Sequence, residues 1–138
     1  MAQLHIDRLF QADAEKVWQV LVDPDRKNLN DIRIEIIEPG DKDKNHKGMI
    51  REVRMNGRRF REKILTVIPK ESIEYQLISG APVHDYFGTI FLYPERIGTT
   101  LRWVVTFKTS FPWPEWLVKK MITRNLNYIL DEIGKVIA

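Results

Sequence analysis

With 138 residues, of which 43% are hydrophobic and 30% charged, the chain has the size and composition of one folded domain, which excludes a fibrous repeat or a disordered segment. The absence of cysteine excludes disulfides and thiolate metal sites, and it favours a cytoplasmic location. A net charge of +3 does not indicate nucleic-acid binding, and no segment approaches the ~20 apolar residues that cross a bilayer.

The chain opens with a predicted strand, and two short helices follow it before a second strand. Apolar residues at i, i+3 and i+4 spacing indicate an amphipathic helix over residues 13–22, with Asp13 as its N-cap. Pro24 is expected to begin another short helix over residues 24–30. The alternating segment 32–36 predicts a strand, and the polar residues 41–47 predict a solvated loop.

From Gly48 onward, apolar residues recur at every second position, which is typical of strands with one buried face. Asn56-Gly57 separates two such runs and predicts a type I′ hairpin, because both residues tolerate positive φ angles. The alternation assigns to one face Met49, Val53, Met55, Phe60, Ile64 and Ile68. Further strands are predicted at residues 71–79, 83–93 and 99–109, and a long helix at residues 114–137.

A two-residue hairpin loop fixes the register of its strands, so Arg51 is expected to lie opposite Glu62 on the inner face. Glu52 opposite Arg61 is then an outward, solvated ion pair. Two interpretations of the inner pair stay open. It is a buried structural salt bridge that fixes strand pairing, or it lines a cavity and presents donors and an acceptor to a ligand.

The predicted C-terminal helix places polar residues within its buried face. Asn125 and Glu132 lie between two apolar stripes, the second of which contains Tyr128. An unpartnered buried polar group costs roughly 1–3 kcal/mol, so we expect Asn125 and Glu132 to meet a partner such as Arg51, or to touch water and ligand. Tyr128 is a further candidate for ligand contact.

Three aromatic residues, Tyr75, Tyr86 and Trp103, bring polar tips to predicted inward positions. Each is interpreted either as an aromatic core residue or as a hydrogen-bonding contact for a ligand. Gly88, within a predicted strand, indicates a bulge or room beside the sheet.

A series of residues over the whole chain points to one family. They are Ala12, Val17, Trp18, Leu21, Asp23, Gly48, Arg51, Gly57, Glu62, Tyr75, Pro82, Tyr86, Trp103 and Phe107. This series resembles the START-like helix-grip superfamily, specifically its polyketide cyclase/dehydrase and lipid-transport branch, often called SRPBCC proteins. The resemblance implies that residues 1–138 form one α+β domain, in which a seven-stranded curved antiparallel sheet wraps around the long C-terminal helix, with two short helices between strands 1 and 2. It also implies a deep cavity for a small molecule.

The resemblance leaves two functions open, because the superfamily includes carriers, sequestering proteins, cyclases and hydrolases. The first is binding or transport of a hydrophobic or amphipathic small molecule, such as a lipid, a polyketide or an aromatic compound, without cofactor or metal. The second is a cyclase or dehydratase in which Glu62 and Tyr75 exchange protons with a substrate held by Arg51. His84-Asp85 is interpreted as a solvated pair or as a catalytic dyad.

Two surface features suggest a third possibility, and the oligomeric state stays open. Cationic residues lie along the predicted hairpin, at Arg54, Arg58, Arg59, Arg61 and Lys63. Aromatic residues lie just before the last helix and at its start, at Phe111, Trp113 and Trp116. They are interpreted as an outer face that resists aggregation, or as a weak peripheral contact with lipid headgroups.

Overall fold

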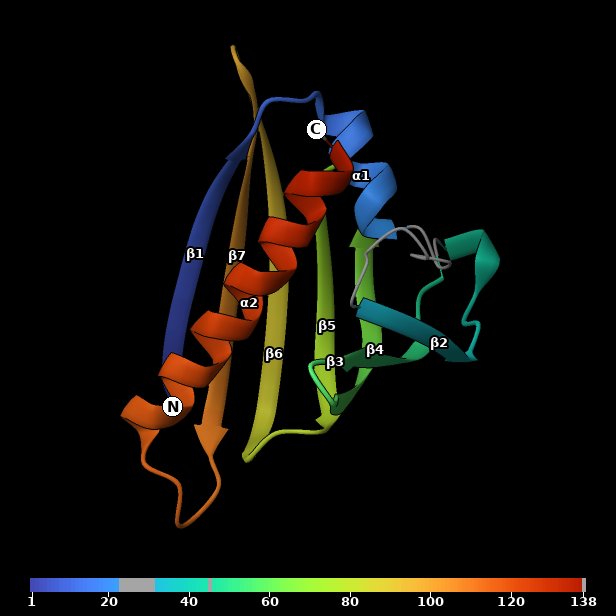
Figure 1. Cartoon of the computed structure of the whole chain (residues 1–138). Helices are drawn as coiled ribbons and strands as arrows, with labels where there is room; N and C mark the ends of the chain where they lie inside the picture. Colours follow the sequence, from blue (N-terminus) through green and yellow to red (C-terminus); the bar gives the residue numbers. More distant parts are fainter. Residues whose placement is uncertain (23–31, 45, 138) are drawn as a thin grey trace.

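The computed structural model of the chain describes residues 1–22, 32–44 and 46–137. Seven strands form one antiparallel sheet in the order β1-β7-β6-β5-β4-β3-β2, and helix α2 lies diagonally across one face of it (Figure 1). The strands are β1 (Ala2–Phe10), β2 (Ile32–Glu38), β3 (Ile50–Met55), β4 (Arg58–Ile68), β5 (Ser72–Ser79), β6 (Val83–Glu95) and β7 (Gly98–Thr109). The helices are α1 (Ala14–Val22), the short 3-10 helix η1 (Lys42–Lys44) and α2 (Glu115–Ile137). The predicted α+β helix-grip fold is confirmed, whereas the short helix expected at residues 24–30 lies outside the described residues.

Helix α1 begins at a capped residue, as predicted. The backbone N–H of Lys16 donates to Asp13 Oδ1 at 2.9 Å, which satisfies one of the free N–H groups of the first turn. The helix buries Val17, Trp18 and Leu21. It lies beside the C-terminal end of α2 in Figure 1, so the two helices together cover the inner face of the sheet.

The hairpin of β3 and β4 has the predicted turn and register. Asn56 and Gly57 adopt positive φ angles of 52° and 74°. Arg51 pairs with Glu62 across the strands. This register turns both charged side chains toward the inner face, where α2 lies.

The alternation in β4 changes after Ile64, which corrects the expected position of Ile68. Ile64 pairs with Tyr75 and Val67 pairs with Ile73, so one extra residue of β4 is inserted between them. Such a bulge exchanges the two faces of the strand. Val67 therefore packs against the core and Ile68 is exposed.

The strand alternation predicts a solvated Glu52, but only 6% of its surface is exposed. Its two carboxylate oxygens accept from Arg54 Nε at 3.0 Å and from Arg61 Nε at 3.3 Å. The hydrogen bond from Arg54, with Arg61 adding its charge, lowers the pKa of Glu52. The long arginine side chains cover a carboxylate on the outer face, where strand alternation alone predicts contact with water.

The centre of the core lies between β7 and α2. Leu101, Val105 and Phe107 have no exposed surface, as the alternation in β7 predicts. Val118 and Leu130 are among the buried residues of α2, which pack against the sheet. Burial of apolar area stabilises this contact by about 25 cal/mol per Å².

Two glycine substitutions are expected to act in opposite directions. Gly57→Ala places a Cβ in open space but at a positive φ angle, and it should lower the free energy of unfolding by about 1 kcal/mol. Gly134→Ala lies inside α2, where its Cβ would meet Phe10 Cε1 at an ordinary 3.6 Å, and it should raise the free energy of unfolding by about 1 kcal/mol. Urea unfolding measures both. If both substitutions changed the free energy of unfolding in the same direction, the assigned turn at Asn56 and Gly57 would be contradicted.

Candidate ligand-binding cavity

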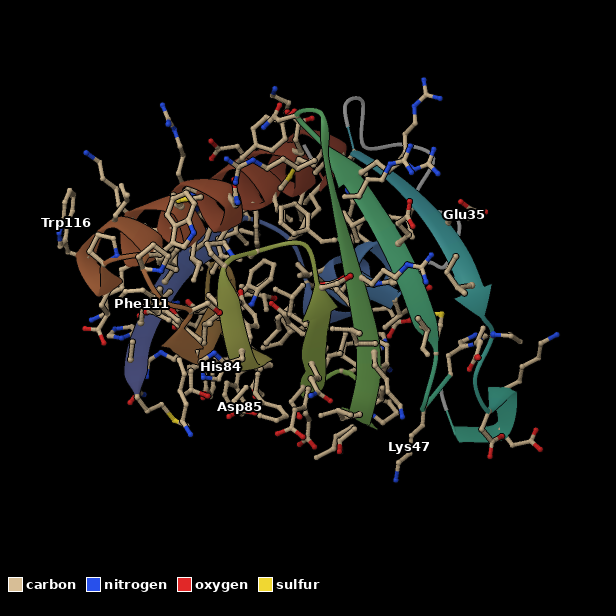
Figure 2. All side chains as sticks on the ribbon, turned by 90° about the horizontal axis from the view of Figure 1, so that it is seen from below. Glu35, Lys47, His84, Asp85, Phe111 and Trp116 are labelled. Carbon is tan, nitrogen blue, oxygen red and sulfur yellow. The ribbon has the colours of Figure 1, made fainter. Side chains whose placement is uncertain are left out.

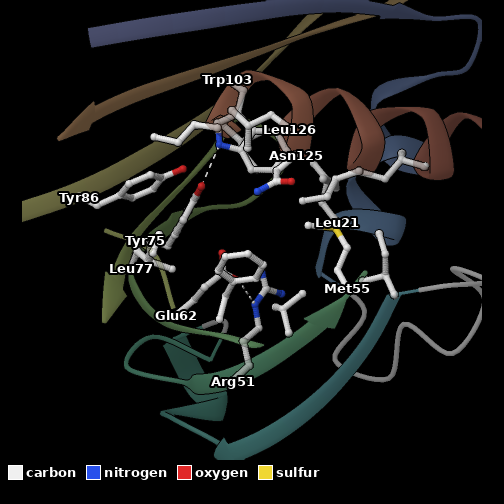
Figure 3. A pocket seen from close by; sticks show the side chains of 18 residues that line it. Leu21, Arg51, Met55, Glu62, Tyr75, Leu77, Tyr86, Trp103, Asn125 and Leu126 are labelled. Carbon is white, nitrogen blue, oxygen red and sulfur yellow. Dashed lines mark hydrogen bonds and ion pairs between the residues drawn. The ribbon is translucent and has the colours of Figure 1, made fainter. Parts of the chain in front are cut away.

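A cavity lies between the sheet and α2, with an empty volume of about 810 Å³ that includes its open mouth. Much of this volume is open solvent, and the space that the centre of a water-sized sphere can occupy is about 80 Å³. Strands β2 to β7 and both helices contribute to the lining, which is mostly apolar. The polar residues of the lining are Arg51, Glu62, Tyr75, Tyr86, Trp103 and Asn125 (Figure 3). Six of the eight predicted ligand contacts thus meet around one space, and their contact with a ligand stays a prediction.

Arg51 and Glu62 form an ion pair on the wall of this cavity. Arg51 Nε donates to Glu62 Oε1 at 3.0 Å, and their side chains are 10% and 14% exposed. The Nη atoms of Arg51 donate to no side chain within the described part of the chain. The pair is therefore both a structural salt bridge and a cavity lining, so the two interpretations drawn from the sequence describe one arrangement.

Tyr75, Tyr86 and Trp103 form an aromatic cluster at the other side of the cavity. Trp103 Nε1 donates to the Tyr75 hydroxyl at 3.0 Å. The ring of Tyr75 meets Trp103 edge-on, with centroids 6.3 Å apart, and its centroid lies 6.2 Å from that of Tyr86. Burial raises the pKa of Tyr75 and of Tyr86 well above the usual value, and the negative charge of Glu62 adds to both shifts. These hydroxyls stay protonated in the folded protein.

Gly88 makes room for this cluster. It lies directly opposite Tyr75 in the pairing of β5 with β6. A Cβ atom at position 88 would collide with the Cζ, Cε1 and hydroxyl atoms of the Tyr75 ring. The irregularity of β6 lies between His84 and Phe87 instead. Of the two interpretations of Gly88, room beside the sheet is the one that the structure confirms.

Asn125 is the polar residue that α2 contributes to the cavity. Figure 3 shows its amide group pointing from the helix toward the space above Arg51 and Glu62. No hydrogen bond joins this amide to any of the described residues. An amide has donors and an acceptor, so Asn125 offers both to a molecule in the cavity.

Tyr128 and Glu132 are not among the described residues that line the cavity, and their contact with a ligand stays a prediction. Glu132 is buried, but its Oε1 accepts from Lys135 Nζ at 2.9 Å, one turn further along α2. Tyr128 packs against the core. On a helix that turns 100° per residue, both lie on the flank beyond Asn125, away from the cavity arc that contains Ile129 and Ile133.

Apolar lining residues such as Phe60, Leu77 and Ile122 were not identified from the sequence as site residues. Their pattern is that of any inward-facing residue, so the sequence has no signal that separates a cavity wall from a filled core. Whether an inward-facing residue lines a cavity or a filled core depends on how the strands curve.

His84 and Asp85 do not form a dyad. His84 Nδ1 lies 3.4 Å from Ser110 Oγ, while Asp85 pairs with Lys108 at 3.4 Å. Both side chains are exposed to solvent, which agrees with the interpretation as a solvated pair rather than a catalytic dyad. Over residues 1–22, 32–44 and 46–137, no group of three or more His, Asp or Glu side chains is placed to hold a metal ion.

The buried tyrosines predict a loss of stability at high pH. An unfolded chain ionises tyrosine near pH ~10, whereas the folded protein keeps Tyr75 and Tyr86 protonated. The folded state then binds more protons, so the free energy of unfolding should fall above pH ~10 by about 1.4 kcal/mol per pH unit for each tyrosine. Denaturant unfolding at several pH values measures the slope. Tyr86→Phe should reduce it, and the exposed control Tyr93→Phe should not.

Gly88→Ala is expected to destabilise the protein by roughly 1–3 kcal/mol, because the new Cβ would collide with the Tyr75 ring and force it out of its packing with Tyr86 and Trp103. Tyr75→Leu removes that ring, so the double variant should lose less stability than the two single variants together. Urea unfolding of the four proteins completes the cycle. Strictly additive losses would mean that Gly88 does not accommodate Tyr75.

Solved structures resemble the whole chain in fold. An uncharacterised protein from Bacillus thuringiensis has a TM-score of 0.80 at 16% identity, over 99% of this chain and 98% of that chain. A START superfamily protein from Mycobacterium smegmatis has a TM-score of 0.80 at 16% identity, over 98% and 96%. Norcoclaurine synthase from Thalictrum flavum, in complex with dopamine and hydroxybenzaldehyde, has a TM-score of 0.74 at 21% identity, over 99% and 86%. At these identities the likeness establishes the fold alone.

No curated protein matches the sequence. The sequence profile of one protein family, described as polyketide cyclase / dehydrase and lipid transport, matches residues 1–137. This match covers both helices, all seven strands and every polar residue of the cavity. The chain belongs to the polyketide cyclase / dehydrase and lipid transport family.

Proposed function

We propose that the protein binds an uncharged hydrophobic or amphipathic small molecule in this cavity and does not transform it. The observation that carries the proposal is the Asn125 amide, which points into a mostly apolar space and meets no described hydrogen-bonding partner. An open amide costs free energy unless water or a ligand satisfies it. Family membership supports the same class of ligand.

The charge of the cavity supports an uncharged ligand. Arg51 and Glu62 cancel each other at 3.0 Å, so the described lining has no net charge to offer. A further buried charge would remain without a counter-ion, which is costly in an apolar environment. The Nη groups of Arg51 and the amide of Asn125 suit a neutral carbonyl or hydroxyl group instead.

The lining also supports a ligand with one or more rings. Tyr75, Tyr86 and Trp103 present aromatic surface next to aliphatic side chains, and aromatic pairs favour tilted or edge-on contacts. The norcoclaurine synthase of similar fold was solved with two small aromatic molecules. An aromatic or polyketide-like compound therefore fits this cavity better than a long unbranched chain.

Catalysis of the cyclase or dehydratase type has less support. General acid–base chemistry works best with a pKa near the operating pH, whereas burial raises the pKa of Tyr75 far above that range. The hydroxyl of Tyr75 already accepts from Trp103, and the carboxylate of Glu62 already accepts from Arg51. Both candidate groups are held in structural hydrogen bonds.

A pair of matched fluorescent probes tests the charge of the ligand. N-phenyl-1-naphthylamine and 8-anilino-1-naphthalenesulfonate share one ring system, but only the second has a sulfonate. We expect the neutral probe to bind more tightly to the wild-type protein. Glu62→Gln leaves Arg51 uncompensated and should reverse this preference. Tighter binding of the sulfonate by the wild-type protein would contradict the proposal.

Asn125→Leu tests the polar contact on a natural ligand. Native mass spectrometry and organic extraction of freshly purified protein identify a retained molecule. Loss of one hydrogen bond should weaken its binding about tenfold. Asn127→Leu makes the same change on the same helix, where Asn127 accepts from Arg8 outside the cavity, and should leave affinity unchanged. Conversion of the retained molecule into a product would establish the enzyme instead.

A further inference from the structure

Three large aromatic side chains are exposed on the segment that joins β7 to α2 and begins the helix. Phe111 is 97% exposed, Trp116 69% and Trp113 45%. Figure 2 shows Phe111 and Trp116 projecting from one end of the molecule. We call residues 110–116 the aromatic loop. Single exposed apolar residues are common, but three neighbouring aromatic residues on one loop indicate an interaction surface.

The aromatic loop is held to the sheet. Ser110 N donates to the carbonyl of Pro82 at 2.9 Å, and Trp113 N donates to the carbonyl of Ser110 at 2.9 Å. Pro112 and Pro114 further restrict the backbone. The aromatic side chains are therefore displayed from a fixed support, which lowers the entropy cost of binding through them.

Positive charge surrounds the aromatic loop. Residues 108–124 contain four cationic residues and one acidic residue. They are Lys108, Lys119, Lys120, Arg124 and Glu115. Lys108 is paired with Asp85, whereas no described side chain forms an ion pair with the other three cations. Lys119 and Lys120 lie one turn after Trp116, so cations and aromatic rings share one surface.

We propose that the aromatic loop docks the protein on the surface of an anionic lipid bilayer. Tryptophan and phenylalanine are favoured at the level of the lipid headgroups, and lysine and arginine beside them attract anionic lipids. In the described part of the chain, no helix is long and apolar enough to cross a bilayer. The contact is therefore peripheral, through this loop and the first turns of α2.

A second copy of the chain is a poorer partner for this surface. A two-fold symmetric dimer brings the same patch of each copy together, and the lysines near Trp116 would then face those of the other copy. Such like charges repel one another. An anionic membrane complements the charge and accommodates the aromatic rings at once.

The docking surface lies close to the cavity. Pro82, which anchors Ser110, follows Ala81 of the cavity lining. Ile122 and Asn125 of the lining lie within three turns of Trp116 on α2. A protein docked in this way holds this side of the cavity near the headgroups, where hydrophobic molecules accumulate. This last step rests on the proposed function, but the docking does not.

Vesicle flotation tests the docking with phosphatidylcholine vesicles that contain or lack phosphatidylserine. We expect binding to the anionic vesicles at low salt, weaker binding at high salt, and a blue shift of tryptophan emission. Trp18 and Trp103 are already buried, so the shift must come from Trp113 and Trp116. The double variant Phe111→Ser/Trp116→Gln should lose at least about tenfold in affinity, and Lys119→Glu/Lys120→Glu should abolish the preference for phosphatidylserine.

Ile97→Ser is the matched control, because Ile97 is also exposed but lies in the β6–β7 turn, at the opposite end of β7. It should bind vesicles like the wild type. Asn125→Leu should also bind vesicles normally, so failure of the cavity proposal would not mimic failure of the docking. Near-ultraviolet circular dichroism confirms that each variant is folded. Absence of binding to anionic vesicles at low salt would overturn the proposal, as would a wild-type dimer that Phe111→Ser/Trp116→Gln dissociates.

Discussion

The ion pair between Arg51 and Glu62 constrains the rest of the cavity. It exists because the turn at Asn56 and Gly57 places these two residues opposite each other on the inner face of β3 and β4. A slip of one residue would turn their side chains to the outer face and bring other charges inward. Two nearly buried charges are stable only as a pair, so the pair favours this register over its neighbours.

The cavity has an aromatic wall on one side and an amide without a described partner on the other. On the side of β5 to β7, Tyr75, Tyr86 and Trp103 are packed together, and their environment disfavours any ionised tyrosine. On the side of α2, the Asn125 amide stays open toward the space. A ligand in the cavity would thus contact aromatic surface on one side and a small number of directional hydrogen-bonding groups on the other. This division is typical of sites in which shape gives affinity and polar groups give orientation.

The fold and most of the site could be predicted from the sequence, because both depend on local signals. A two-residue turn fixes one register, a period of two assigns the face of each strand, and the helical period assigns Asn125 to the buried arc. The errors lie where distant parts of the chain decide. The bulge that exposes Ile68 depends on pairing with β5, and the burial of Glu52 depends on arginines that fold back over it. Glu132 is buried on α2 as expected, but its partner is Lys135 one turn away, which the sequence pattern does not single out.

The contact between Gly88 and Tyr75 has a consequence beyond this chain. The aromatic side of the cavity depends on two positions on adjacent strands: Tyr75 lines the space, and Gly88 has no side chain, which leaves room for the Tyr75 ring against the backbone. A family member with a larger residue at the glycine position must hold a smaller one, or a differently oriented ring, at its partner. The two positions should therefore vary together among relatives. The residue types at this pair of positions should then indicate how each family member shapes this side of its cavity.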